Sequence, residues 1–293
     1  MTERALTVEL PHGLFDADGV CHRDAVLRAM TGNEELMLAD LGPGDEPEPR
    51  AVQGAVSALL VSVLERLGDY DRIDDELVRA LTRGDRQALV LHLRAGLYGD
   101  RISLVVRCPN PACAALCDVD LRISELLPGP AAPRPHVACE TPSGAAVIHE
   151  PTGADDDAVA AAAERGGSRA ERVALLWSRL VELDGRRLAA DEWPALPAAT
   201  RHAIAAALAD ASRAPELTFL ARCPTCAAHL ELVIDPFTLL ARELRLGGDR
   251  LFAEVHALAF HYHWSEAEIL ALPRPRRWRY LELLGRELEG RPL

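Results

Sequence analysis

The chain has 293 residues, 49% of them hydrophobic, so it is long enough to bury one or two hydrophobic cores. Its formal net charge of −13 argues against a general affinity for nucleic acid or for anionic membranes. No hydrophobic stretch approaches the length of a membrane span, and the first residues lack a signal-peptide core, so we expect a soluble cytoplasmic protein.

The first part of the sequence, residues 1–127, predicts a mixture of strands and helices. A Thr-Gly turn followed by acidic residues begins at Thr31, which suits a helix N-cap because carboxylates in the first turn complement the helix dipole. The segment 41–49, rich in Gly, Pro and acidic residues, predicts an exposed loop. In chain order, the expected elements are a strand at 5–10, helices at 51–67, 74–81 and 85–95, and a strand at 118–123.

The second part, residues 139–246, predicts a similar series. It follows a Pro-rich segment, 128–138, that lacks helix or strand character and that we interpret as a linker. A second Thr-Gly turn with acidic residues begins at Thr152. The expected elements are a strand at 145–149, helices at 154–164, 170–183 and 198–210, and a strand at 229–234.

The two parts align with each other. Residues 81–109 match residues 196–224 without a gap, at a shift of 115 positions, and both stretches end in Arg-Cys-Pro. Chance similarity in a chain rich in Ala and Leu is the alternative, but the hydrophobic positions, cysteine pairs and Thr-Gly turns keep one order, which favours duplication. We therefore expect an α+β fold of two pseudo-symmetric repeats, each with helices and a β-hairpin.

Four cysteines have the spacing of metal ligands: Cys108 with Cys113, and Cys223 with Cys226. A tight turn between two strands, here called a cysteine knuckle, presents two sulfurs at once, and zinc takes four such ligands tetrahedrally. The alternatives are a dithiol redox centre, which prefers a helix N-terminus after a strand, and cysteines that are simply buried. Because the pairs are related by the repeat, we predict one zinc shared by both repeats, with a structural role because protein ligands fill all four positions.

Two further residues near the knuckles are weaker candidates for metal ligands. Cys117 aligns with Leu230 of the second repeat, which predicts a buried, apolar role for this thiol. His229 lies three residues after Cys226, but its counterpart is Leu116, which argues against a ligand role.

The last segment, residues 247–293, predicts a helical tail. Ser265 followed by Glu268 is a capping box that should open a short helix ending at 272, and a last amphipathic helix is expected at 280–288. Arg and Trp are typical of interface anchors, so this tail is a candidate for docking a protein partner, with a solvated helix face as the alternative. The candidate docking residues are Trp264, Arg276, Arg277, Trp278 and Tyr280.

Both ends of the chain carry sequence motifs that are similar to those of one protein family. These motifs are residues 9–13, 18–19 and 28–35 near the start, and 262–270 with Pro273, Arg276, Arg277, Tyr280 and Leu281 near the end. They resemble the T4-like phage baseplate family, which also occurs in contractile injection systems. The resemblance implies a non-enzymatic structural or assembly component of a baseplate or hub, with other tail subunits as partners and possible incorporation in a phage tail-like particle. It also implies an assembly chaperone as an alternative role.

Two function classes compete with this expectation. A zinc-ribbon module that binds nucleic acid requires a basic surface near the knuckles, where the sequence instead has acidic residues such as Asp118, Asp120 and Glu231. An enzyme requires a catalytic constellation, and no Ser-His-Asp spacing, phosphate-binding Gly loop or H-E-x-x-H motif is present. We therefore expect no small-molecule substrate, and we expect partners that are proteins.

Overall fold

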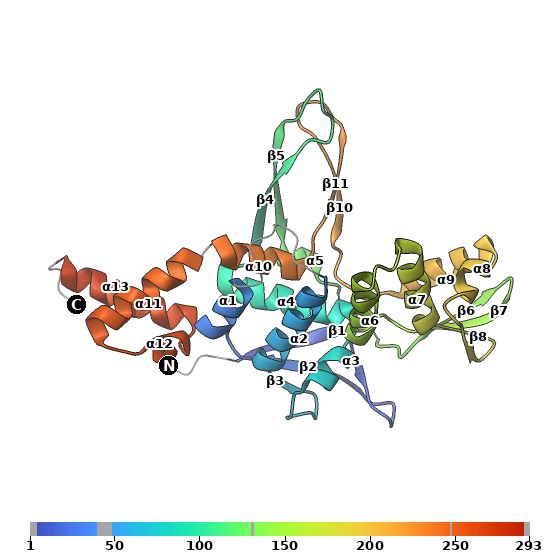
Figure 1. Cartoon of the computed structure of the whole chain (residues 1–293), viewed down its shortest axis with the longest axis horizontal. Helices are drawn as coiled ribbons and strands as arrows, with labels where there is room; N and C mark the ends of the chain where they lie inside the picture. The colour runs from blue at the N-terminus through green and yellow to red at the C-terminus, as the bar shows by residue number, and fades with distance from the viewer. Residues whose placement is uncertain (1–4, 40–48, 130–131, 247, 290–293) are drawn as a thin grey trace.

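The computed structural model describes residues 5–39, 49–129, 132–246 and 248–289, and it is a mixture of helices and antiparallel sheets (Figure 1). The α+β class predicted from the sequence is confirmed. Within the described ranges, no helix is both long enough and hydrophobic enough to cross a lipid bilayer. The predicted loop at 41–49 falls almost wholly outside the described residues, since only Pro49, the first residue of a helix, is among them.

The first half of the chain contains a three-stranded antiparallel sheet in the order β1-β2-β3, with helices packed around it. Helix α4 packs against strand β1, and α2 lies against α3 and α4. The elements are β1 (Leu6–Phe15), β2 (Cys21–Leu27), α1 (Gly32–Ala39), α2 (Pro49–Val63), β3 (Leu64–Leu67), α3 (Asp75–Ala80), α4 (Arg83–Tyr98), β4 (Arg101–Arg107), β5 (Leu116–Arg122) and α5 (Ile123–Leu126).

The second half contains its own antiparallel sheet, in the order β6-β7-β8-β9. Apart from the additional strand β9, its described elements follow the same order as those of the first half. They are β6 (Val137–Thr141), β7 (Gly144–Ile148), α6 (Gly153–Glu164), α7 (Arg169–Leu180), β8 (Val181–Leu183), β9 (Arg186–Arg187), α8 (Glu192–Ala195), α9 (Ala198–Ala211), β10 (Thr218–Arg222), β11 (His229–Val233) and α10 (Pro236–Leu246).

Strand pairing follows equivalent registers in the two sheets. Ala25 of β2 lies opposite Leu67 of β3, and Ala146 of β7 lies opposite Leu183 of β8. The sequence reasoning missed both partner strands, because it extended the preceding helices to 67 and 183. Leu and Glu favour helices locally, but pairing with the neighbouring strand outweighs this weak preference and ends α2 at Val63 and α7 at Leu180.

The C-terminal segment consists of α11 (Gly248–Tyr262), α12 (Glu266–Leu270) and α13 (Arg274–Leu288). The capping box of Ser265 and Glu268 is confirmed, with each side chain bonded to the other's backbone N–H. The last helix begins at Arg274 rather than at 280 as predicted. Proline is tolerated in the first helical turn because its missing N–H would have no partner there, so Pro275 does not prevent the earlier start.

The largest hydrophobic core joins the first half to α10, which comes from the second half. Phe237, Leu240 and Leu244 of α10 are buried in the same cluster as Leu59 and Leu89. A smaller core lies in the second half, under α7, α8 and α9. Figure 1 shows the hairpins β4–β5 and β10–β11 rising side by side from the same face of the central body, so the two knuckles lie at their common tip.

Candidate metal centre

The two projecting hairpins pack against each other through alternate residues of their strands. In β4–β5, Leu104 lies opposite Val119 and Val106 lies opposite Cys117 on the inner side. Leu230 and Leu232 of β11 complete the cluster from the other hairpin. Since successive residues of a strand point to opposite faces, the alternation that buries these side chains also directs the cysteines inward.

Each knuckle closes with the same backbone geometry. The Cys108 N–H donates to the Ala115 carbonyl over 2.8 Å, and the Cys223 N–H donates to the Ala228 carbonyl over 2.9 Å. The residue after the second cysteine has a positive φ in both turns, 47° at Ala114 and 59° at Ala227. The longer first knuckle accommodates its two extra residues and still closes in this way.

The knuckles bring four sulfur atoms together. The Sγ atoms of Cys108, Cys113, Cys223 and Cys226 all lie within 4.8 Å of one another. Cys108 Sγ is 3.6 Å from Cys226 Sγ, and Cys113 Sγ is 3.9 Å from Cys223 Sγ. A zinc–sulfur bond of about 2.3 Å gives a tetrahedron whose edges measure roughly 3.8 Å, so these separations fit one zinc ion. The cluster predicted from the sequence is confirmed, and it has the ligands to hold a metal ion.

Electrostatics within the cluster favour a bound cation. Backbone N–H groups of Cys226 and Thr225 bond to the Cys223 sulfur and lower the pKa of this thiol to about 6. The Asn110 N–H lowers the pKa of Cys108, but burial and the neighbouring sulfurs outweigh it and raise that pKa to about 12. A divalent metal ion binds cysteines as thiolates and offsets part of the repulsion between neighbouring negative sulfurs.

Cys117 is a fifth sulfur at this site, which the sequence reasoning treated only as an apolar residue. Its side chain is buried, and its Sγ lies 3.7 Å from Cys223 Sγ, within reach for S–H donation to a thiolate. Its position on β5, directly opposite Val106 on the face that carries Cys108, could have indicated this contact. His229 is exposed at the start of β11 and is not part of the sulfur cluster.

The tail residues predicted to dock a partner divide into two groups. Trp264 and Tyr280 pack edge-to-face, with ring centroids 4.8 Å apart. The Trp278 indole N–H donates to Glu254, and the guanidinium of Arg250 lies over its ring at 4.3 Å. These three aromatic residues thus contact other residues of the tail and remain partly accessible.

The two arginines differ sharply in their environment. Arg276 is exposed, whereas the side chain of Arg277 is fully buried. Arg277 bonds to Glu35 Oε1 over 2.8 Å, to Glu254 Oε2 over 3.0 Å and to the Leu272 carbonyl over 2.7 Å. Its charge is therefore used to attach the tail to α1 and not at the protein surface, which the amphipathic pattern of the last helix did not indicate.

Comparison of the chain with protein-family models, with curated proteins and with solved structures finds no match.

Proposed function

We propose that this chain is a non-enzymatic structural or assembly component of the baseplate or hub of a phage-like contractile injection system, stabilised by one structural zinc. The zinc is supported by the convergence of four sulfur atoms, two from each half of the chain. Two of the distances between them, 3.6 and 3.9 Å, are close to the edge of a tetrahedron around one zinc ion. With four protein ligands, the ion has no position for a reactive water, so its role is to clamp the two hairpins together.

The clamp follows from an internal duplication, which several equivalent contacts support. The Arg28 N–H bonds to the Val63 carbonyl, and the His149 N–H bonds to the Leu180 carbonyl, each over 2.9 Å. The matched registers of the two sheets and the positive φ of Ala114 and Ala227 also support an internal duplication. A pseudo-symmetric pair of hairpins presents its two knuckles to a common point, which is how residues so distant in sequence share one ion.

The baseplate assignment rests on the resemblance at the two ends of the chain. These two stretches contact each other: Thr31 forms a β-bridge with Pro273, and Glu35 pairs with Arg277. The motif at residues 28–35 therefore meets the motif of the C-terminal segment in the fold. Mass spectrometry of purified tail-like particles from the source cells tests the proposal, with the chain expected among the baseplate proteins. Its absence from finished particles, with copurification of assembly intermediates, would instead assign a chaperone role.

A nucleic-acid-binding zinc ribbon is the second candidate, because paired knuckles also occur in such modules. The outer face of β4–β5 argues against it, since Asp120 bonds to Arg101 over 2.7 Å and neutralises one of the few basic residues there. Gel-shift assays with duplex and single-stranded DNA at moderate salt distinguish the candidates. Saturable binding that falls when Arg107 and Arg222 are replaced by Glu would favour the ribbon.

A further inference from the structure

Both Thr-Gly turns dock onto the start of another helix, and they do so through the same atoms. Thr31 forms a β-bridge with Pro273, and the Gly32 N–H donates to the Leu272 carbonyl over 3.3 Å. In the second turn, Thr152 bridges to Thr82, and the Gly153 N–H donates to the Leu81 carbonyl over 3.1 Å. The helices that receive the turns are α13 and α4, each preceded by a short helix.

An arginine of the receiving helix lies directly under each turn. A Cβ atom on Gly153 would collide with the guanidinium group of Arg86, and a Cβ on Gly32 would meet Leu270 at 2.8 Å and Arg277 at 3.1 Å. A side chain is therefore disfavoured at both places, because neighbouring residues, the arginine among them, approach the glycine backbone closely.

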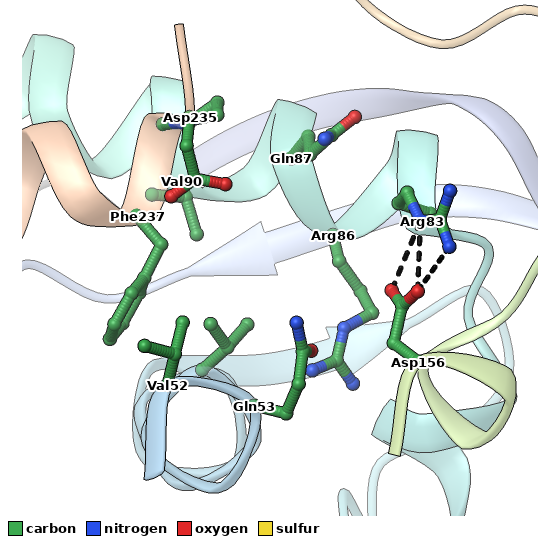
Figure 2. Close-up of a pocket in the computed structure, with 11 residues that line it drawn as sticks. Val52, Gln53, Arg83, Arg86, Gln87, Val90, Asp156, Asp235 and Phe237 are labelled. Carbon is green, nitrogen blue, oxygen red and sulfur yellow. Dashed lines mark hydrogen bonds and ion pairs between the residues drawn. The ribbon is translucent and has the colours of Figure 1, made fainter. Parts of the chain in front are cut away.

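Acidic residues of the turns add ion pairs. Glu35 bonds to Arg277, and Asp156 bonds to Arg83 Nε over 2.9 Å. Figure 2 shows this second contact, with Asp156 reaching from α6 to Arg83 beside the hollow between α2 and α4. Each docked turn is thus held by a backbone bond, a close glycine contact and a charge pair.

The receiving element has a sequence pattern that occurs three times in the chain. A buried apolar residue of a short helix is followed three residues later by Leu and eight residues later by Arg. The three sets are Val78, Leu81 and Arg86; Trp193, Leu196 and Arg201; and Ile269, Leu272 and Arg277. In all three the arginine donates to a backbone carbonyl of the preceding segment, namely that of Val78, Pro194 or Leu272.

The middle set, at the start of α9, receives no turn from the part of the chain that the structure describes. Within the described residues, no backbone N–H donates to the Leu196 carbonyl, and Arg201 is half-buried where Arg86 and Arg277 are buried. An open hollow of about 370 Å³ lies here between α7, α8 and α9, and Trp177 and Trp193 stack 4.6 Å apart in its wall. Val173, which also lines it, is 41% exposed.

We propose that this groove on α7, α8 and α9 binds a Thr-Gly-acidic turn that opens a helix in a different protein. The two filled sites of this chain show which groups the occupant must supply. Its glycine lies over the arginine of the receiving helix, its backbone N–H donates to the leucine carbonyl, and its carboxylate pairs with an arginine. Arg201 supplies that cationic side in the groove. A second copy of the chain is a poor occupant, since both of its own turns are already docked internally. The inference is independent of the zinc.

A fluorescent peptide with the sequence of residues 149–164, which carries the second turn, is a direct probe of the groove in the full-length chain. Fluorescence anisotropy should detect saturable binding. Arg201→Glu should weaken it by about tenfold or more, because charged anchors dominate such contacts. Ala198→Trp, at an exposed position of the hollow, should block it without touching the core. Arg66→Glu, an equal charge change at an exposed site on β3, should leave it unchanged.

The peptide with Gly153→Val is the matched ligand control and should not bind, because its side chain would strike Arg201. The proposal is overturned if the wild-type peptide fails to bind at millimolar concentration. It is equally overturned if binding survives both groove variants, or if sedimentation shows a dimer of the chain that Arg201→Glu dissociates, which would assign the groove to a second copy. Zinc content is unaffected in every case, so these results are separate from the test of the metal.

Discussion

The sulfur of Cys108 lies 3.6 Å from the sulfur of Cys226, although 118 positions separate the two residues in the sequence. This contact ties the hairpin of the first half to the hairpin of the second. The proposed zinc would bind at this contact and hold the two hairpins together.

Cys226→Ser should release the metal, because zinc binds three thiolates and a hydroxyl much more weakly than four thiolates. Elemental mass spectrometry should show the zinc content fall from about one ion per chain to near zero. The free energy of unfolding should fall by several kcal/mol, since binding worth on the order of 10 kcal/mol is coupled to folding. Cys139→Ser, at a thiol outside the cluster, should keep its zinc. An unchanged zinc content in Cys226→Ser would contradict the site.

Arg277→Met should be among the most destabilising substitutions in the chain. It leaves the buried carboxylate of Glu35 without its ion-pair partner and removes one of the partners of Glu254, which costs about 3–5 kcal/mol. Urea unfolding followed by circular dichroism measures the loss. The adjacent and exposed Arg276→Met should change stability by less than about 0.5 kcal/mol. Equal effects of the two variants would show that Arg277 is not a buried anchor.

Glu35 should make stability depend on pH in a defined direction. Burial raises its pKa above the ordinary value of 4.5, although Arg277 opposes the shift. The folded state therefore binds this proton more tightly than the unfolded chain, and the stabilisation is complete below pH 4.5 and is lost as pH rises through the higher folded pKa. Relative to wild type, Glu35→Gln should gain stability between pH 4.5 and 7. Parallel stability–pH curves for the two proteins would exclude the shift.

Gly153→Ala should disturb the docked turn at α4. Its new Cβ would collide with the buried Arg86, and such overpacking costs about 1–3 kcal/mol. Gly96→Ala is the matched control, because Gly96 lies exposed in α4 with nothing near its Cβ position. That substitution should stabilise the helix by about 0.5–1 kcal/mol. Thermal melts should therefore shift in opposite directions, and a shift of both in one direction would refute the close contact.

Ala227→Gly should stabilise the second knuckle. Ala227 has a φ of 59°, a left-handed conformation that costs a non-glycine residue about 1–2 kcal/mol. Glycine adopts this conformation without strain, but it also raises the conformational entropy of the unfolded chain, which cancels part of the gain. The expected gain is about 0.5–1 kcal/mol with zinc content unchanged. Ala228→Gly, one residue further and packed in the hairpin cluster, should instead destabilise. A lower melting temperature for Ala227→Gly would show that the turn does not strain this residue.

Local patterns in the sequence were sufficient for the features that depend on neighbouring residues. The capping box at Ser265, the helix before each hairpin and the pairing of cysteines within each knuckle all follow from spacings of a few positions. The predicted repeat then placed the two knuckles at one site, because equivalent units are expected to place equivalent turns at equivalent positions. The short strands β3 and β8 were not predicted, because the strands β2 and β7 with which they pair lie about 40 residues away along the chain.

Long-range packing alone decided the rest. Nothing near Arg277 in the sequence indicates that Glu35, 242 positions away, would neutralise it in the interior, and an amphipathic pattern cannot distinguish an exposed arginine from one buried in an ion pair. The same holds for the Thr-Gly turns: their local sequence specifies a helix start, but only the fold decides that α4 and α13 each receive a turn while none of the described residues docks a turn at α9. Burial and charge pairing act between surfaces that meet only when the whole chain has folded, so residue type fixes what each group is able to do and tertiary structure selects what it does.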